Sequence, residues 1–249
     1  MSVDLRVYAE LNDFLRPGER YTVLRRPCRP HQTVKDVIEA AGIPHTEIDL
    51  ILVDGEPVDF DHRPRPGARI TAYPVFETLD IGRVTLVRPH PLREPRFLAD
   101  VNLGGLAKLM RLLGLDVHCR WTAGDAELAE ASAAEHRILL TRDRGLLKRR
   151  NVTHGVYIRS DRPGDQVVEL IRRLDLAARL DPFTRCLRCG GVVAEVGKAE
   201  VEDRLEPLTR RYYDTFRQCR ACGRIYWQGS HQARLAETVA AIRAELDRS

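Results

Sequence analysis

The sequence lacks any long hydrophobic run and has few cysteines. None of its apolar segments reaches the roughly 20 residues that a membrane-spanning helix requires. The first residues, Met1–Arg6, also lack the apolar segment of a secretory signal peptide. These absences exclude the class of membrane proteins and predict a cytoplasmic protein that has no membrane partner.

Cysteine is scarce, yet four of the six cysteines form two C-x-x-C pairs, each followed by a glycine: Cys186 with Cys189, and Cys219 with Cys222. Two such pairs are typical of a tetrahedral zinc site, and a site with four sulfur ligands is structural rather than catalytic. Two disulfides are the alternative, which the missing secretion signal disfavours. Cys28 and Cys119 remain, and we expect them to be buried free thiols.

The charge is unevenly placed along the 249 residues, although the net charge is only +4. Residues 1–90 carry 12 Lys and Arg against 14 Asp and Glu, whereas residues 91–249 carry 28 against 22. A nucleic-acid partner, if there is one, is therefore expected to contact the later part of the chain.

Residues 1–82 predict a small α+β domain. Strands are expected at Val3–Tyr8, Tyr21–Leu24, Leu50–Val53 and Arg69–Val75, with a helix from about Val34 to Ala41. This order resembles the β-grasp, or ubiquitin-like, fold, and looks closest to its small sulfur carriers. Those carriers end in Gly-Gly, which is absent here, so carrier chemistry is excluded. A docking role for a protein partner and a purely structural role both remain open, and His31, His45 and His62 are expected to be solvated.

Residues 83–95 predict a linker, because the three prolines at 89, 91 and 95 oppose both a helix and a central strand.

Residues 96–181 predict an α/β domain with a parallel sheet. Expected strands at Arg96–Asp100, Asp116–Trp121, Arg137–Thr141 and Gly155–Ser160 alternate with expected helices at Leu103–Leu113, Ala126–Glu135 and about Gln166–Leu180. Such alternation implies right-handed crossovers, and ligands of these folds bind at the carboxyl edge of the sheet.

Four aspartates are expected to meet at that edge. Asp100, Asp143 and Asp161 fall at strand ends, and Asp125 has the capping position of a helix that starts there. Their mutual repulsion favours a hard divalent cation, Mg²⁺ or Mn²⁺, which prefers oxygen ligands and can activate water. Alternatively, each aspartate is simply a helix cap or a turn residue, which for Asp143 alone is the commoner explanation.

Basic residues beside these carboxylates, Arg142, Arg144 and Lys148, are candidates for contacts with the RNA backbone. Arg210 and Arg211 lie between the two cysteine pairs, among Tyr212, Tyr213 and Phe216. Arginines interleaved with aromatics suit single-stranded RNA, although the aromatics could equally form the core of a zinc ribbon. Residues 182–231 are therefore expected to form that ribbon, and residues 232–249 a C-terminal amphipathic helix that packs on the α/β domain.

Several segments of the chain carry a resemblance to a known family: Phe97–Asp100, Leu103–Gly114, Ile138–Arg144 and Asp181–Cys186. They look like the mutator-seven C-terminal RNase family, which is similar to PIN-domain nucleases, carries a C-terminal zinc ribbon and in some members has a ubiquitin-like front domain. The resemblance implies a metal-dependent ribonuclease in which Asp100, Asp125 and Asp143 match the acidic positions. Gly145 departs from the pattern, because family members often have an acidic residue there.

We therefore expect a hydrolase that cleaves RNA phosphodiester bonds through Mg²⁺ or Mn²⁺ at Asp100, Asp125, Asp143 and Asp161. The alternative is a non-catalytic RNA-binding or adaptor protein that uses the ribbon and the ubiquitin-like domain. A nuclease that acts on DNA is a third possibility.

Overall fold

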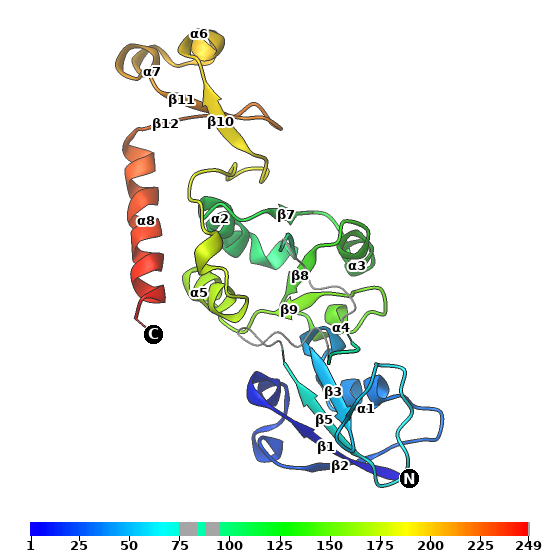
Figure 1. The fold of residues 1–249 in the computed structure, drawn as a ribbon. Helices are drawn as coiled ribbons and strands as arrows, with labels where there is room; N and C mark the ends of the chain where they lie inside the picture. The colour runs from blue at the N-terminus through cyan, green and yellow to red at the C-terminus, as the bar shows by residue number, and fades with distance from the viewer. Residues whose placement is uncertain (75–83, 88–94, 249) are drawn as a thin grey trace. The chain divides into compact units, whose positions relative to one another are not determined.

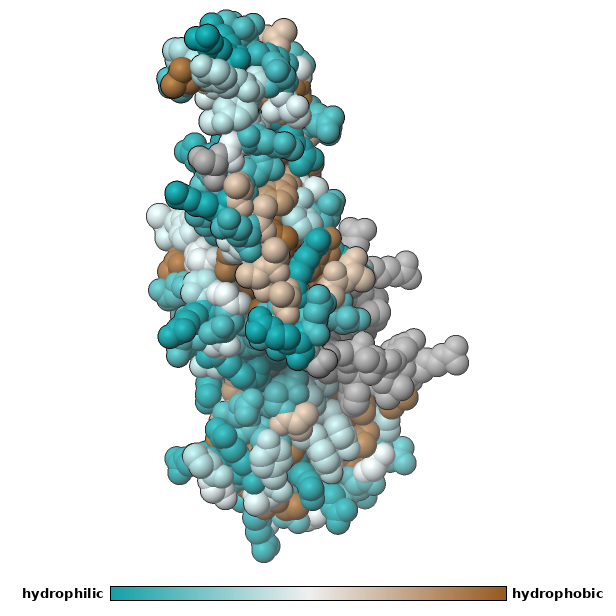
Figure 2. All heavy atoms as spheres, turned by 90° about the vertical axis from the view of Figure 1, so that its left-hand side faces the viewer, coloured by the Kyte–Doolittle hydropathy of each residue, from teal (hydrophilic) through white to brown (hydrophobic). Residues whose placement is uncertain are grey.

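The computed structural model describes residues 1–74, 84–87 and 95–248 (Figure 1). The described residues form two compact units, one within Met1–Pro95 and Ala123–Tyr157, the other within Arg96–Thr122 and Ile158–Ser249. None of the described helices is both long and hydrophobic enough to cross a bilayer. On the face drawn in Figure 2, hydrophilic side chains predominate, with smaller hydrophobic areas between them.

The N-terminal part of the first unit is a five-stranded mixed sheet with one helix. Its strands are β1 (Ser2–Val7), β2 (Leu24–Pro27), β3 (Leu50–Val53), β4 (Glu56–Pro57) and β5 (Arg69–Tyr73), in the order β2-β1-β5-β3-β4. β1 and β5 are parallel, and the other pairs are antiparallel. Helix α1 (Val34–Ala40) buries Val34, Val37 and Ile38 in the same hydrophobic core. This architecture confirms the predicted β-grasp fold.

One predicted strand was misplaced by several residues. The sequence suggested Tyr21–Leu24, but β2 begins only at Leu24, which pairs with Leu5. Tyr21 has a φ angle of +59°, and its N–H donates to Asn12 Oδ1 at 2.7 Å. A left-handed residue cannot continue a strand, so extended pairing starts after this turn. Three short 3₁₀ helices, Ala9–Phe14, Pro17–Glu19 and His45–Glu47, complete the domain.

The rest of the first unit comes from the α/β region. It contains α3 (Asp125–Ala134), β8 (Ile138–Thr141), α4 (Arg144–Leu147) and β9 (Gly155–Tyr157). β8 and β9 are parallel, and α3 packs against β8 and α4. The strand predicted to run to Ser160 therefore ends three residues earlier, at Tyr157.

The second unit contains another parallel pair, β6 (Phe97–Ala99) and β7 (Val117–Cys119). A 3₁₀ turn (Val101–Leu103) and α2 (Gly104–Leu112) follow β6, and α5 (Pro163–Arg173) packs against α2. The predicted helix, from about Gln166 to Leu180, begins three residues after the true start of α5 at Pro163. A proline is well tolerated in the first turn of a helix, because the N–H that it lacks would have no partner within the helix. Asp175, with a φ angle of +45°, marks the end, and a 3₁₀ turn (Ala177–Arg179) follows.

The C-terminal part of the second unit is a three-stranded antiparallel ribbon followed by a long helix. The ribbon consists of β10 (Val193–Val196), β11 (Phe216–Cys219) and β12 (Ile225–Trp227), in that order in the sheet. Two short helices, α6 (Lys198–Val201) and α7 (Pro207–Tyr212), and a 3₁₀ turn (Glu202–Arg204) lie between β10 and β11.

The predicted tail helix is confirmed as α8 (Ser230–Leu246). It packs on α5 of the α/β region, as expected, and buries Val239 and Ile242. The Arg172 side chain donates to the carbonyl oxygen of Glu245 at 2.7 Å.

The predicted linker, 83–95, and the end of the predicted strand at Val75 lie mostly outside the described residues. The domain boundaries therefore stay predictions.

Candidate metal centre and carboxylate sites

The four ribbon cysteines converge on one point. Their Sγ atoms all lie within 4.8 Å of one another, with Cys186 and Cys222 at 3.6 Å and Cys189 and Cys219 at 3.5 Å. A tetrahedral zinc ion with Zn–S bonds of about 2.3 Å implies sulfur separations of about 3.8 Å, whereas a disulfide bond is about 2.05 Å. The spacing therefore fits a four-coordinate metal, and this cysteine group could bind zinc.

Local backbone geometry explains why each C-x-x-C pair presents two sulfurs to one point. Gly190 and Gly223, one residue after each pair, have φ angles of +80° and +70°. Their N–H groups donate to the carbonyl oxygens of Cys186 and Cys219, at 2.8 and 2.9 Å. Each turn thus closes on a left-handed residue, a conformation that glycine adopts without strain. The glycines noted in the sequence therefore shape the two turns that bring the four sulfurs together.

The surroundings of Cys186 favour its thiolate. Burial raises the pKa of Cys186, but hydrogen bonds from the Tyr226 hydroxyl, at 3.0 Å, and from backbone N–H groups outweigh it and lower the pKa to about 6. Burial is the main reason that the pKa of Cys189 rises to about 12. Thiolates are the form that coordinates metal, and a hydrogen bond to a ligand sulfur is a common feature of such sites. Sequence reasoning missed this contact, because Tyr226 lies 40 residues after Cys186 in the chain.

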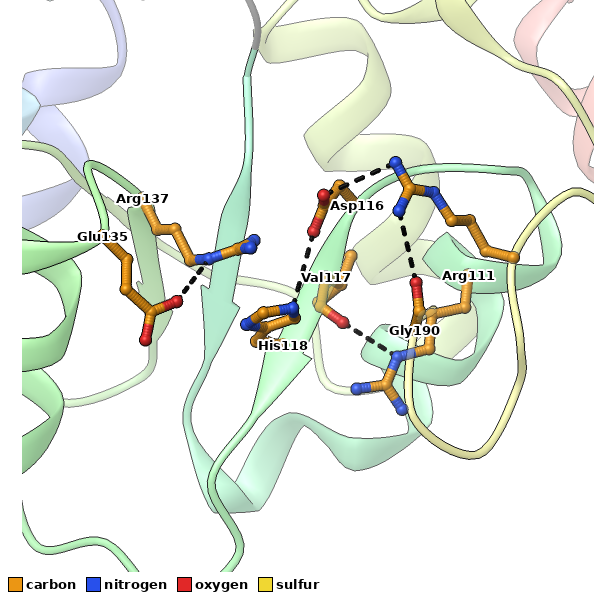
Figure 3. A network of polar contacts seen from close by, with 8 residues as sticks. Arg111, Asp116, Val117, His118, Glu135, Arg137 and Gly190 are labelled. Atoms are coloured by element: carbon orange, nitrogen blue, oxygen red, sulfur yellow. Dashed lines mark hydrogen bonds and ion pairs between the residues drawn. The ribbon is translucent and has the colours of Figure 1, made fainter. Parts of the chain in front are cut away.

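Two arginines fasten the ribbon to the α/β region of the same unit (Figure 3). Arg111, on α2, is 3% exposed, and its side chain donates to the carbonyl oxygens of Val117, at 2.9 Å, and of Arg188, at 3.1 Å. Arg185 pairs with Asp116 at 3.4 Å and donates to the carbonyl oxygen of Gly190 at 3.4 Å. The metal-binding turn is therefore fixed to β7 through backbone acceptors.

Asp100 follows β6 directly and is 8% exposed. Its carbonyl oxygen accepts the N–H of Leu103, which turns the chain into α2. The start of α2 is tightly packed: a Cβ on Gly104 would lie 2.7 Å from the Trp121 ring, and one on Gly105 would lie 2.6 Å from Pro163. The chain after β6, the loop after β7 and the start of α5 therefore lie close together, as the carboxyl edge of a parallel sheet requires.

Asp161 is exposed and lies in the loop between β9 and α5, two residues before Pro163. Side chains of α5 shape this loop. The Glu169 carboxylate accepts the N–H groups of Arg159, at 3.1 Å, and Ser160, at 2.9 Å, and Gln166 donates to the carbonyl oxygen of Ser160 at 3.0 Å. Sequence reasoning missed Gln166 and Glu169, although their i, i+3 spacing on a predicted helix face offered a signal.

In the first unit, Asp143 is the N-cap of α4. Its Oδ1 accepts the N–H groups of Gly145, at 2.6 Å, and Leu146, at 3.4 Å. Gly145 suits this cap, because a Cβ there would lie 3.1 Å from the same oxygen. Asp125 is the first residue of α3 rather than its N-cap, which is Gly124, and both carboxylates are exposed. The capping interpretation of Asp143 is thus confirmed, and it leaves Oδ2 without a role in the cap.

Asp125 and Asp143 belong to one compact unit, and Asp100 and Asp161 to the other. Their convergence on a shared cation stays a prediction.

Two of the basic residues proposed for RNA binding contact the ubiquitin-like domain. Arg144 donates to the carbonyl oxygen of Phe14 at 3.3 Å and lies 5.0 Å from the Phe14 ring centroid and 5.2 Å from that of Tyr157. Lys148 donates to the carbonyl oxygen of Glu39 at 2.7 Å. Burial lowers the pKa of Lys148. Arg142 is exposed, as are Arg210 and Arg211 on α7, and the role of all five in RNA binding stays a prediction.

The expectation that His45 is solvated was wrong. Its ring is buried, with Nδ1 at 2.7 Å from a carboxylate oxygen of Glu39 and Nε2 at 2.9 Å from the carbonyl oxygen of Val152. Nearby, the buried Glu47 accepts the N–H of Tyr157 at 2.5 Å. The ubiquitin-like domain therefore packs against the α4–β9 segment through polar side chains. Nothing in the local sequence pattern marks contacts between residues about a hundred positions apart.

Comparison with known proteins gives two family matches. The family model described as Mut7-C RNAse domain matches residues 95–239, which is more than half of the chain, and the one described as Mut7-C ubiquitin matches residues 1–80. No curated protein and no solved structure matches the chain.

Proposed function

This chain belongs to the Mut7-C RNase family, and from that membership we propose that it is a metal-dependent ribonuclease. The reaction is hydrolysis of an RNA phosphodiester bond. The observation that carries the proposal is the family match over residues 95–239, which includes all four candidate carboxylates.

The four aspartates are the groups proposed to hold the catalytic cation. Each one lies where the chain leaves a strand or enters a helix of the α/β region: Asp100, Asp125, Asp143 and Asp161. Their donor set is entirely oxygen, which suits Mg²⁺ or Mn²⁺ and not a soft metal. A bound ion of this kind supplies water activation and stabilises the charge on the leaving oxygen.

The packing around Asp100 supports this assignment. Asp100, which is 8% exposed, lies where the chain after β6, the loop after β7 and the start of α5 come together, the edge at which parallel sheets bind their ligands. Gln166 and Glu169 fix the loop that carries Asp161. We assign them the role of positioning residues, because their contacts are to the backbone of that loop.

We further propose that the ribbon cysteines bind zinc and that the ion is structural. All four ligands are sulfur, so a tetrahedral ion has no open position for substrate. The ribbon then serves as a rigid attachment on the α/β region rather than as a second catalytic centre.

The decisive experiment compares wild type with Asp143→Asn. Asparagine is as good an N-cap as aspartate, so this variant should keep α4 and the fold while it loses a charged ligand. We expect cleavage of a single-stranded RNA with Mn²⁺ to fall by at least about 100-fold, as for other removed electrostatic groups in active sites. Chelation should abolish cleavage by wild type. Undiminished cleavage by Asp143→Asn would exclude this carboxylate from the mechanism.

A second candidate function is a non-catalytic RNA-binding or adaptor protein. One observation favours it: Asp143 is used as a helix cap. The family resemblance adds that Gly145 stands at a position where an acidic residue is expected. This candidate predicts RNA binding without turnover at any concentration of Mg²⁺ or Mn²⁺. Wild type that binds RNA and leaves it intact would select this function.

A further inference from the structure

A groove in the second unit is formed mainly by the ribbon. It is lined by residues between 182 and 195 and between 208 and 229, with additional contributions from α2 and the start of α8. Its volume of about 1080 Å³ is slightly larger than the roughly 300–1000 Å³ that small-molecule sites occupy. None of the four candidate aspartates lines it, so it is a separate feature of the described residues.

The groove has an aromatic wall that is open to solvent. Trp227 and Tyr212 are 39% and 65% exposed, and Leu208 beside them is 69% exposed. Exposed apolar side chains that gather in one place mark an interaction surface rather than a core. The sequence left open whether Tyr212, Tyr213 and Phe216 form the ribbon core. Phe216, which is 1% exposed, has that role and Tyr213 packs against it, whereas Tyr212 stays exposed.

The charged residues that line the groove are mostly positive. It includes five basic side chains, which are Lys108, Arg185, Arg188, Arg217 and Arg224, and only one acidic side chain, Glu195. Lys108, Arg188 and Arg224 are exposed, whereas Arg185 is engaged with Asp116. The charge of the groove is therefore complementary to an anionic ligand.

Several contacts hold this wall in place. The Arg217 side chain donates to the carbonyl oxygen of Phe183 at 3.0 Å, and the Arg224 guanidinium lies 5.9 Å from the centroid of the Tyr226 ring. Tyr226 is itself bound to Cys186. A Cβ on Gly229 would lie 3.2 Å from the Trp227 indole nitrogen, so the glycine lets the indole pack against the backbone. The metal centre and the groove thus share Tyr226.

We propose that this groove binds single-stranded RNA, with bases stacked on Trp227 and Tyr212 and phosphates paired with Arg188 and Arg224. Proteins bind single-stranded nucleic acids through aromatic side chains that stack on bases and cationic side chains that pair with phosphates. The bases of a duplex are already stacked on one another and have no open face for an aromatic side chain. The choice of RNA over DNA as the ligand rests on the proposed ribonuclease function. The proposal that the groove binds a single strand does not depend on that function.

The direct test uses Trp227 as its own reporter. The chain has two tryptophans, so the full-length, zinc-loaded double variant Trp121→Phe/Asp143→Asn leaves Trp227 as the sole one, in a protein expected not to cleave. Addition of a short oligouridylate should quench its fluorescence. In the Asp143→Asn background, Trp227→Ala should weaken binding of a labelled oligouridylate by about 5- to 150-fold, the range expected for one lost stacking contact.

Two arginine variants on the ribbon distinguish binding in the groove from a nonspecific attraction of RNA to positive charge. Arg224→Gln should weaken binding and reduce the slope of log affinity against log salt by about 0.7, the loss of one phosphate contact to a single strand. Arg220→Gln is the control, because Arg220 is also exposed but does not line the groove. Its salt slope should match that of the parent. Zinc content should be measured for each variant, because it reports whether the ribbon has folded.

The outcomes distinguish this proposal from the ribonuclease function. If zinc-loaded Trp227→Ala and Arg224→Gln bind oligouridylate as tightly as the parent, the groove proposal is wrong, whether or not wild type cleaves RNA. If they bind weakly and wild type never cleaves, the groove stands and the ribonuclease function fails. Quenching of Trp227 by an apolar peptide, with no response to oligouridylate, would identify a protein ligand and overturn the proposal.

Discussion

The ubiquitin-like domain and the zinc ribbon reach a folded state by different means. Among the described residues, the ubiquitin-like domain has one cluster of 18 buried hydrophobic residues, whereas the ribbon has two clusters of three. One of the two ribbon clusters includes Cys186 and Cys219 themselves. A domain with so small a core needs a metal or disulfides to be stable. The comparison indicates that hydrophobic burial stabilises the first module, whereas the second depends on the zinc that we propose for its four cysteines.

Removal of zinc should have the largest effect and should be confined to the ribbon. Metal binding contributes about 10–16 kcal/mol to the folding of small zinc domains at neutral pH. We expect chelation, or Cys219→Ser, to remove hydrogen-exchange protection from β10–β12, because the ribbon then loses the metal–sulfur bonds that would join its two C-x-x-C turns, and the remaining core is small. Protection of β1, β3 and β5 should persist, because their core contains no metal.

Cys28→Ser is the matched control for that experiment. Cys28 is buried in the ubiquitin-like core, so its replacement should leave the bound zinc unchanged. Persistent protection of β11 in metal-free protein would show that the ribbon core is sufficient without the ion.

The converse experiment is to damage the hydrophobic core. Ile38, on α1, is fully buried, and Ile38→Ala should cost about 2–5 kcal/mol of unfolding free energy, the usual range for such truncations. Denaturation followed by hydrogen exchange should show the loss in β1–β5. Val23→Ala, at a residue 52% exposed, should change the stability by less than about 0.5 kcal/mol. An equal effect of both substitutions would contradict the assignment of Ile38 to the core.

The two modules also differ in how much the sequence revealed of them. The cysteine spacing is a local signal, so the ribbon and its four ligands could be predicted from positions three residues apart. The β-grasp strands followed from period-two alternation, but the start of β2 did not, because nothing in that alternation indicates that Tyr21 adopts a left-handed conformation. The contacts that His45, Arg144 and Lys148 make within the first unit could not be predicted for another reason. Their partners lie about a hundred residues away, and no spacing rule connects them.

His45 tests how the ubiquitin-like domain is attached to the α4–β9 segment. His45→Ala removes hydrogen bonds to Glu39 and Val152 and takes this partner from the carbonyl oxygen of Val152, which is buried, and such a loss typically costs about 1–3 kcal/mol. We expect faster hydrogen exchange in the α4–β9 segment while zinc content stays constant. His31→Ala is the control, because His31 is exposed in the same domain. Unchanged exchange in His45→Ala would mean that these contacts contribute little to the attachment.

The smallest expected effect on stability is that of Arg210→Gln. The effect of the same substitution on RNA binding decides which surface of the ribbon contacts RNA. Its side chain lies 4.0 Å from the Glu202 carboxylate, and both are about 45% exposed. Such exposed pairs are usually worth less than about 1 kcal/mol, so Arg210→Gln should leave zinc content and unfolding unchanged. If Arg210 contacts phosphate as the sequence predicts, the salt slope of oligouridylate binding should fall by about 0.7, as for Arg224→Gln. If only Arg224→Gln lowers the slope, RNA follows the groove and not the outer face of α7, and the prediction for Arg210 is wrong.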